Sequence, residues 1–348
     1  MKIRQGERFR VACIFATSIG LLIVGVPNGQ AAAKTMANCQ VVMIPKTTDN
    51  PFYAAIHFGA DQAAKELKGK KVQFAGTAQA DSQGQIQRVQ AAATNKTCIL
   101  NPAAVDASAI VPALKAAAKK GVKIVAFDAD IADKSARTLF ITQDSTDRLG
   151  KGMFIELATQ MNNKGDWAIL SAQSTAQNQN AWIEGMKKEA AKSKYAGMNL
   201  VKTVYGDDDD KKSYDEAIAL LNAFPNLSGV MAPEPAGVGA FLKAKDDLKY
   251  NPELVITGLG WLPGQGDALK SGKLKAFFLW SPVDLGYLTY YADAALISGK
   301  ITGKKGDTFM AGRLGKMTVG ADGEVNMRGM QRYTAENVDA GLEGYRTK

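Results

Sequence analysis

Polar and aromatic residues directly follow a series of short apolar runs in this 348-residue sequence. They comprise one ammonium, two carboxylates, two side-chain amides, two prolines and two aromatic rings, namely Lys46, Asp128, Asp130, Asn178, Gln179, Pro233, Pro235, Phe52 and Trp280. A hydroxyl group donates and accepts hydrogen bonds at once, and the C–H faces of a sugar ring pack on aromatic planes. This mixture of side chains predicts a binding site for a hydroxyl-rich small molecule.

Motifs of common catalytic sites are missing from the same sequence. It has no G-x-S-x-G elbow, no G-x-x-x-x-G-K-[ST] loop and no C-x-x-C pair. Its one histidine, His57, argues against a histidine metal site or a Ser-His-Asp triad. We therefore expect a binding protein that is not an enzyme and holds no metal or cofactor. The enzymatic alternative is a sugar-modifying enzyme that uses Asp128 and Asp130 as its acid–base pair.

A run of four aspartates, Asp207 to Asp210, precedes a helical pattern that begins near Lys211. The run lacks the alternating order and the terminal Glu of a calcium-binding loop. Aspartates at the start of a helix cap its free N–H groups and complement its dipole. We interpret the run as a helix cap.

Apolar runs of strand length alternate with helical patterns along the chain. The expected strands are Val41–Ile44, Val72–Phe74, Cys98–Leu100, Lys123–Phe127, Thr138–Ile141, Trp167–Leu170, Leu200–Tyr205, Gly229–Ala232, Leu254–Gly258 and Lys275–Leu279. Such alternation predicts parallel sheets with helices on both faces. Because the pattern restarts after Asp144, we expect an α/β protein with two doubly wound lobes. The site should lie at the carboxyl ends of their strands.

The first 33 residues have the three parts of a secretory signal peptide. A basic head is followed by an uncharged run from Val11 to Val26 and by small residues that end at Ala33. This run is short for a membrane anchor, since the hydrocarbon core is ~30 Å thick. We expect export to the periplasm with cleavage near Ala33. Removing four basic residues and one acidic residue would lower the net charge from +9 to +6.

Charge elsewhere is thinly spread and forms no basic stripe interleaved with aromatics. We therefore expect no nucleic-acid partner.

Longer segments of the chain resemble the periplasmic sugar-binding proteins of ABC importers, which have the type I, ribose-binding-like fold. Within them the sequence is similar to the rhamnose-binding and autoinducer-2-binding branch. The segments that carry the resemblance are Ile44–Lys46, Asn50–Tyr53, Phe127–Asp130, Asn178–Glu184, Tyr205–Asp210, Ser213–Ala217, Thr257–Gly260, Leu279–Tyr287 and Ala311–Gly315.

The resemblance implies how a ligand is held. The autoinducer-2 receptors use a Lys, two Asp, a Gln and backbone near a Pro-x-Ala, which correspond to Lys46, Asp128, Asn178, Gln179, Pro233 and Pro235. Asn178 stands where those receptors have Asp, and Pro235 where they have Ala. An amide accepts a weaker hydrogen bond than a carboxylate. Rhamnose or a related deoxy sugar is therefore the first-ranked ligand, and autoinducer-2, for uptake or signalling, is the alternative.

The resemblance also implies a hinge that the chain crosses three times, near Thr142-Gln143, Trp280-Ser281 and Phe309–Gly312. The expected first lobe then contains residues 34–142 and 281–311, and the second contains residues 143–280 and 312–348. Closure of the lobes would bury the sugar. The closed monomer would then dock on an ABC permease in the inner membrane.

Two cysteines, Cys39 and Cys98, remain after the signal peptide. In a sheet of order 2-1-3-4-5 the first and third strands are neighbours. Both cysteines lie at the amino ends of these strands, where Cα atoms can fall within the ~4.4–6.8 Å of a disulfide. The sequence therefore predicts a disulfide between them.

Overall fold

The computed structural model describes residues 35–94 and 96–343. The predicted signal peptide, residues 1–33, and its cleavage site near Ala33 lie outside the described residues. In the described ranges, no helix combines the length and the hydrophobicity needed to cross a membrane.

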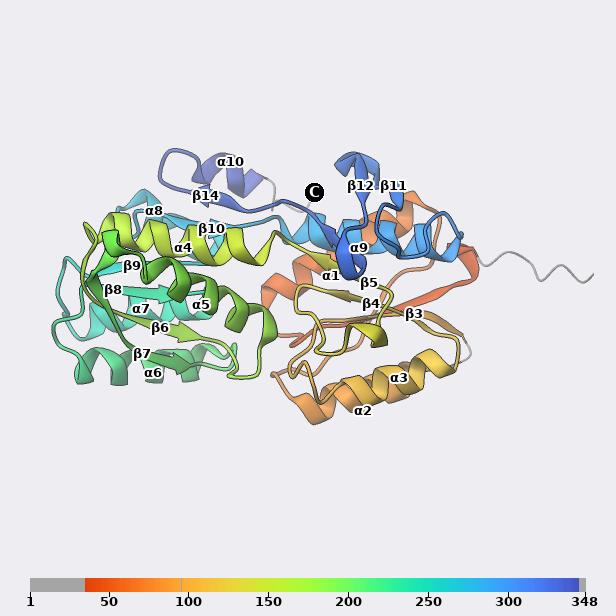
Figure 1. The fold of residues 1–348 in the computed structure, drawn as a ribbon, viewed down its shortest axis with the longest axis horizontal. Coiled ribbons are helices and arrows are strands. Elements are labelled where there is room, and N and C mark those ends of the chain that lie inside the picture. The colour runs from red at the N-terminus through yellow and green to blue at the C-terminus, as the bar shows by residue number, and fades with distance from the viewer. Residues whose placement is uncertain (1–34, 95, 344–348) are drawn as a thin grey trace, which may run out of the picture. The chain divides into compact units, whose positions relative to one another are not determined.

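A six-stranded parallel sheet organises the first lobe (Figure 1). Its strands run in the order β13-β5-β4-β3-β1-β2, with bounds β1 Gln40–Ile44, β2 Gln73–Phe74, β3 Thr97–Pro102, β4 Lys123–Phe127, β5 Leu139–Thr142 and β13 Glu324–Asn326. On one face α1 (Pro51–Glu66) packs against α9 (Pro282–Ile297), and the other face carries α2 (Ser82–Ala92) and α3 (Val111–Lys119). The chain order reverses between β1 and β3, which is where such sheets form a ligand crevice.

A four-stranded parallel sheet organises the second lobe, in the order β7-β6-β8-β9. The strands are β6 Lys164–Ser171, β7 Gly197–Tyr205, β8 Gly229–Ala232 and β9 Val255–Gly258. Helices α4 (Thr146–Gln160) and α5 (Gln177–Ala190) pack together, as do α6 (Asp210–Ala223) and α7 (Pro235–Asp247) on the opposite face (Figure 1). The predicted α/β class with two doubly wound parallel sheets is confirmed.

Additional elements extend the second lobe beyond β9. Strand β10 (Phe277–Leu279) joins β9 through a parallel bridge between Leu259 and Phe278, and β14 (Gln331–Tyr333) pairs antiparallel with β10. Helices α8 (Leu262–Lys270) and α10 (Val338–Glu343) pack against each other beside them.

Close contact between α1 and α9 depends on two glycines. A Cβ atom on Gly59 would lie 1.8 Å from the Val283 carbonyl oxygen, and one on Gly286 would lie 1.8 Å from that of Ile56. Any side chain at either position would force the two backbones apart. Helix α9 is buried on nearly all sides, because it lies between α1 and strands β3, β4 and β5.

The chain passes between the lobes at residues 143–145, 280–281 and 327–330. The third of these differs from the crossing near Phe309–Gly312 that the resemblance implies. Residues 312–348 were expected in the second lobe, whereas Val325 of β13 pairs with Ile141 of β5 and so belongs to the first sheet. The hairpin of β11 (Thr308–Met310) and β12 (Lys316–Thr318) leads into β13, so the chain stays with the first lobe until Asn326.

Two of the crossings are hydrogen-bonded to each other. The amides of Met327 and Gly329 donate to the carbonyl oxygens of Thr142 and Gln143, at 2.9 and 2.8 Å. The buried Asp144 carboxylate accepts the Met330 amide at 3.1 Å. These bonds hold the first and third crossings side by side.

The predicted disulfide is not formed: no bond joins Cys39 and Cys98, and both side chains are buried. Strand register gives the reason. Gln40 pairs with Thr97 and Val41 with Ile99, so Cys98 is the extra residue of a bulge, while Cys39 precedes Gln40. The two cysteines are therefore offset along the strands, and each packs as a small apolar side chain in the core.

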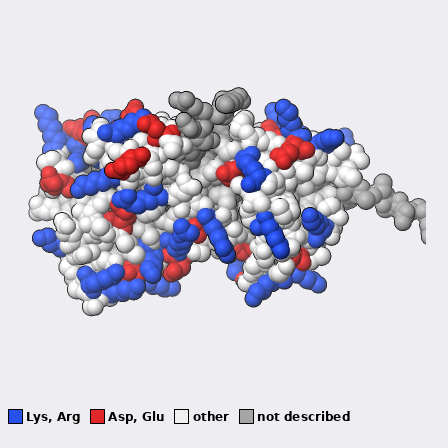
Figure 2. Space-filling view, turned by 90° about the horizontal axis from the view of Figure 1, so that it is seen from above, with Lys and Arg blue, Asp and Glu red and all other residues white. Residues whose placement is uncertain are grey.

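Charged side chains are dispersed over the face drawn in Figure 2, where Asp and Glu lie among the Lys and Arg. Several form surface ion pairs, such as Arg332 with Glu156 and Lys134 with Asp322, both at 2.7 Å. This distribution agrees with the thinly spread charge of the sequence.

Candidate functional site

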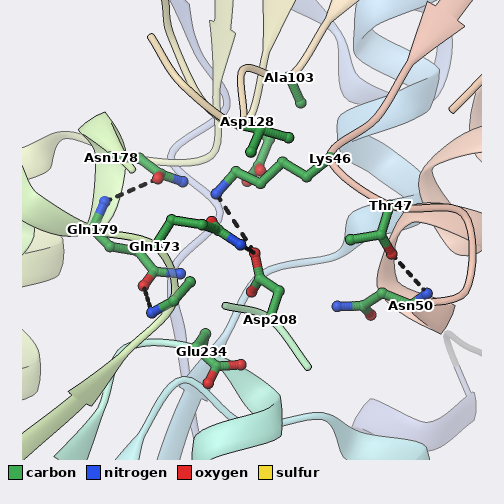
Figure 3. Close-up of polar contacts among 12 residues, drawn as sticks. Lys46, Thr47, Asn50, Ala103, Asp128, Gln173, Asn178, Gln179, Asp208 and Glu234 are labelled. Carbon is green, nitrogen blue, oxygen red and sulfur yellow. Dashed lines mark hydrogen bonds and ion pairs between the residues drawn. The ribbon is translucent and has the colours of Figure 1, made fainter. Parts of the chain in front are cut away.

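Residues that follow the strands of both sheets meet in one cavity between the lobes (Figure 3). Lys46 follows β1 and Asp128 follows β4 of the first lobe. From the second lobe, Asn178 and Gln179 lie on the first turn of α5, and Asp208 follows β7. The arrangement follows from parallel strand order, because the carboxyl ends of the strands lie at one edge of each sheet.

Lys46 makes a contact that links the two lobes. Its Nζ lies 3.9 Å from Oδ2 of Asp208, and both side chains are almost completely buried. The same Asp208 oxygen accepts a hydrogen bond from the Gln173 amide at 3.3 Å (Figure 3). A buried ammonium and carboxylate thus face each other across the lobe boundary.

Asp128 lies in a strained turn at the end of β4, with a φ of 58°. The Tyr53 hydroxyl donates to its Oδ2 at 2.9 Å. Burial raises the pKa of Asp128 to about 6, although nearby Lys46 opposes this shift. Burial and the Asp128 charge raise the pKa of Tyr53 well above its usual value, so this hydroxyl keeps its proton and remains a donor.

Glu234 is a second buried carboxyl group of the cavity. It caps α7, and its two oxygens accept the amides of Gly237 and Ala236, both at 2.7 Å. Burial, with a contribution from the Asp208 charge, raises the pKa of Glu234 to about 8. At neutral pH, Glu234 is therefore mostly protonated.

Side-chain amides on α5 are held in fixed orientations. Oε1 of Gln179 accepts the Ser171 hydroxyl at 2.6 Å and the Ala172 amide at 2.8 Å. Since its oxygen is used in this way, Gln179 can offer its NH₂ group to the cavity. Oδ1 of Asn178 accepts the Gln179 backbone amide at 2.9 Å (Figure 3).

A row of aromatic rings forms the apolar wall of the cavity. Trp280, at the second crossing, has its ring centroid 6.0 Å from that of Phe52 in the first lobe and 5.9 Å from that of Trp182 in the second. Phe52 in turn contacts Tyr53 edge-on at 5.2 Å. The wall therefore continues from one lobe through the hinge into the other.

Seven of the residues singled out in the sequence line this cavity: Lys46, Phe52, Asp128, Asn178, Gln179, Pro235 and Trp280. Pro233 is adjacent in sequence to the lining residue Glu234, but it does not line the cavity itself. Asp130 points elsewhere, because Arg137 holds both of its oxygens, at 2.5 and 2.6 Å, in a buried ion pair. An acid–base pair of Asp128 and Asp130 is therefore not assembled here.

The ligand-binding residues predicted from the sequence did not include Asp208, Glu234, Tyr53 and Trp182, which also line the cavity. The expected helix cap is present, since Asp209 accepts the Lys212 amide at 2.7 Å. Its neighbour Asp208 turns into the cavity instead. The sequence did offer an indication that this run could reach the site, because the run comes just after the strand that ends at Tyr205.

No group of three or more His, Cys, Asp or Glu side chains in the described part of the chain could hold a metal ion. His57 packs in the first lobe, where it stacks on Phe74 at 4.6 Å and donates to the Val72 carbonyl at 3.0 Å.

A protein-family model described as a periplasmic binding protein domain matches residues 41–301. The chain belongs to this periplasmic binding protein family. The chain is similar to a solved structure described as a sugar ABC transporter from Actinomyces odontolyticus, with 38% identity and a TM-score of 0.70 over 88% of this chain and 98% of that one. Membership implies a periplasmic location and a non-enzymatic role in transport.

Two further solved structures that resemble this chain carry ligands. An ABC transporter solute-binding protein from Clostridium phytofermentas with bound L-rhamnose is 29% identical, with a TM-score of 0.83 over 89% of this chain and 99% of that one. LsrB from Clostridium saccharobutylicum in complex with AI-2 is 22% identical, with a TM-score of 0.79 over 86% and 99%. The chain is thus a sugar-binding protein of an ABC importer, with the two-lobed fold of these structures.

Proposed function

We propose that this protein binds L-rhamnose or a related deoxy sugar between its lobes and presents it to an ABC permease. The observation that carries the proposal is the buried cavity in which one ammonium, carboxylates, fixed amides and an aromatic wall converge from both lobes. The rhamnose-bound relative, at 29% identity over 89% of this chain, supports the choice of sugar.

Each group of the cavity has a role in this proposal. Asp128 and Asp208 accept hydrogen bonds from sugar hydroxyls, while Lys46 and the NH₂ group of Gln179 donate to them. The methyl group and the C–H face of a deoxy sugar pack on Trp280. Hydrogen bonds to charged groups contribute about 1.5–3 kcal/mol each, so a few of them account for a specific site.

Binding is proposed to proceed by hinge motion at the three crossings. In the structure Lys46 contacts Asp208 directly across the lobes, so a sugar must separate these side chains to reach the cavity. The lobes open, and they close again with sugar hydroxyls between the two charges. Closure presents a surface that includes both lobes to the permease.

A thermal-shift screen followed by calorimetry tests the proposal. The panel contains L-rhamnose, L-fucose, pentoses, polyols and autoinducer-2. A ligand at a hundred times its Kd stabilises a protein by about 2.7 kcal/mol, which is readily measured. We expect the largest shift with L-rhamnose or a closely related deoxyhexose. If no deoxyhexose shifts the melting temperature, the proposal fails.

Autoinducer-2 is the alternative outcome of this screen, and Asn178→Asp sharpens the distinction. This substitution supplies the carboxylate that autoinducer-2 receptors have at the position. We expect it to favour autoinducer-2 relative to rhamnose. If the unsubstituted protein already prefers autoinducer-2, the uptake or signalling alternative takes the place of rhamnose binding.

A further inference from the structure

A second and larger cavity adjoins the proposed sugar site. Its volume is about 460 Å³, which falls within the ~300–1,000 Å³ typical of small-molecule pockets. Asn50, Asp208 and Pro235 line both cavities, so the two spaces are neighbours. The outer cavity is also formed by both lobes, with Thr47 and Gln79 from the first and Trp261 from the second.

This outer cavity remains while the lobes are in contact. Lys46 touches Asp208, and the Thr175 hydroxyl donates to the Val105 carbonyl across the lobe boundary at 3.4 Å. The inner cavity has closed to about 30 Å³, enough for about two water molecules. Lobe contact thus nearly fills the inner cavity with side chains but leaves ample space in the outer one.

Side chains of the outer cavity suit an uncharged, hydroxylated group. Trp261, half-buried at the start of α8, offers an aromatic surface. Gln265 is held in place, because its Oε1 accepts the Trp261 amide at 2.7 Å and its Nε2 donates to the Pro235 carbonyl at 2.8 Å.

Charge in the outer cavity argues against an anionic occupant. Its lining includes Asp49, Asp208, Asp209 and Asp210, against one cation, Lys243. That cation is already paired with Asp247 and lies over the Tyr214 ring at 4.5 Å. A phosphate or a uronic acid carboxylate would therefore meet an excess of negative charge.

We propose that the outer cavity binds a second, uncharged sugar ring. The full ligand would then be a glycoside whose first ring occupies the inner site and whose second ring packs on Trp261. This inference rests on the proposed sugar-binding function and extends its substrate class from free monosaccharides to two-ring glycosides.

Calorimetry with three probes tests the inference: L-rhamnose, methyl α-L-rhamnoside and a rhamnosyl-rhamnose disaccharide. We expect the disaccharide to bind at least about tenfold more tightly than the methyl glycoside, since it alone reaches Trp261. Trp261→Ala should remove this gain and leave the affinity for L-rhamnose within about twofold, whereas Trp261→Phe should keep most of the gain.

A variant that fills the outer cavity tests the inference independently, in case the Trp261 variants misfold. Ala236→Leu places a larger side chain in the outer cavity and should abolish the disaccharide's advantage without weakening L-rhamnose binding. Ala116→Leu, on the exposed face of α3, is the matched control and should change neither affinity.

Two results would overturn the inference. If L-rhamnose binds but the disaccharide binds no more tightly than the methyl glycoside, the outer cavity is not a second-ring site and the proposed function stands. If none of the three probes binds, the rhamnose proposal and the inference built on it fall together.

Discussion

Nζ of Lys46 lies 3.9 Å from Oδ2 of Asp208, and the two side chains come from opposite lobes. Each is buried, so neither charge has much water to solvate it. A ligand that enters between them must supply polar groups to both. Substitution of Lys46 is therefore the most direct test of the site.

Lys46→Ala should weaken binding of L-rhamnose by about tenfold to a hundredfold, which corresponds to the loss of one charge-assisted hydrogen bond. Calorimetry measures the effect. Lys134→Ala, in the same lobe but in an exposed ion pair with Asp322, is the matched control and should bind normally. An unchanged affinity in Lys46→Ala would remove this residue from the site.

Sugar affinity should depend on pH through Asp128, whose pKa burial raises to about 6. The proposed binding uses the ionised carboxylate as an acceptor, so affinity falls as pH drops through this pKa. Between pH 7.5 and pH 5 we expect about a tenfold loss. Glu234, with its pKa raised to about 8, remains mostly protonated from pH 5 to 7 and contributes little in that range.

Asp128→Asn provides the control for this pH dependence. It cannot ionise, so its affinity should be weaker at pH 7.5 and nearly constant down to pH 5. Calorimetric titrations at four or five pH values separate the two curves. A variant that keeps the full pH dependence would assign it to another group.

Stability should fall at alkaline pH because of Asp293, a fully buried residue of α9. Burial raises its pKa well above the usual value, and Asn101 donates to its Oδ1 at 3.1 Å. Among the described residues, neither Oδ2 of Asp293 nor Oδ1 of Asn101 has a hydrogen-bond partner. A proton on Asp293 would let it donate to Asn101 and satisfy both oxygens.

The sign of this effect follows from the raised pKa in the folded state. The stabilising contribution of protonated Asp293 is complete below the pKa that this residue has in the unfolded chain, near 4. It is lost as pH rises through the pKa of Asp293 in the folded protein. From pH 5 to pH 9 we expect a progressive decrease in the free energy of unfolding, measured by urea unfolding. Asp293→Asn can keep both hydrogen bonds without ionising, so its stability should vary less over this range.

Gly59→Ala should destabilise the first lobe severely, because the new Cβ would meet the Val283 backbone at 1.8 Å. Overpacking of this kind costs about 1–3 kcal/mol or more. Gly185→Ala in α5 is the matched control, since its Cβ would have no contact closer than 3.5 Å. There we expect no loss, or a gain of up to about 1 kcal/mol from better helix propensity. Thermal unfolding of both variants measures this difference in stability.

Much of the site could be predicted from the sequence because parallel strands bring their carboxyl ends to one edge. Lys46, Asp128, Asn178 and Gln179 were found in this way. Asp208 was not, since capping by Asp209 explained the aspartate run, and only the left-handed turns at residues 207 and 208 reveal which side chain enters the cavity.

Features that local sequence patterns do not reveal account for the other differences. The pairing of Asp130 with Arg137 depends on the turn after β4, and the sequence does not show it. Helix α9 carries no regular apolar stripe, because it is buried on nearly all sides, and so its periodicity gave no signal. Strand β13 has three residues, too few for a recognisable pattern, so the sequence did not show that the chain returns to the first sheet after the third crossing implied by the resemblance.

The position of β13 has a consequence for the order in which the chain can fold. The first lobe gains α9 and its sixth strand only from residues 282–326, after the four-stranded sheet of the second lobe has been synthesised. Its sheet therefore joins residues almost two hundred positions apart, and contacts of such long sequence separation form slowly. The lobe that begins the chain is thus completed late, and it lacks its central helix and an edge strand until residues 282–326 have been synthesised.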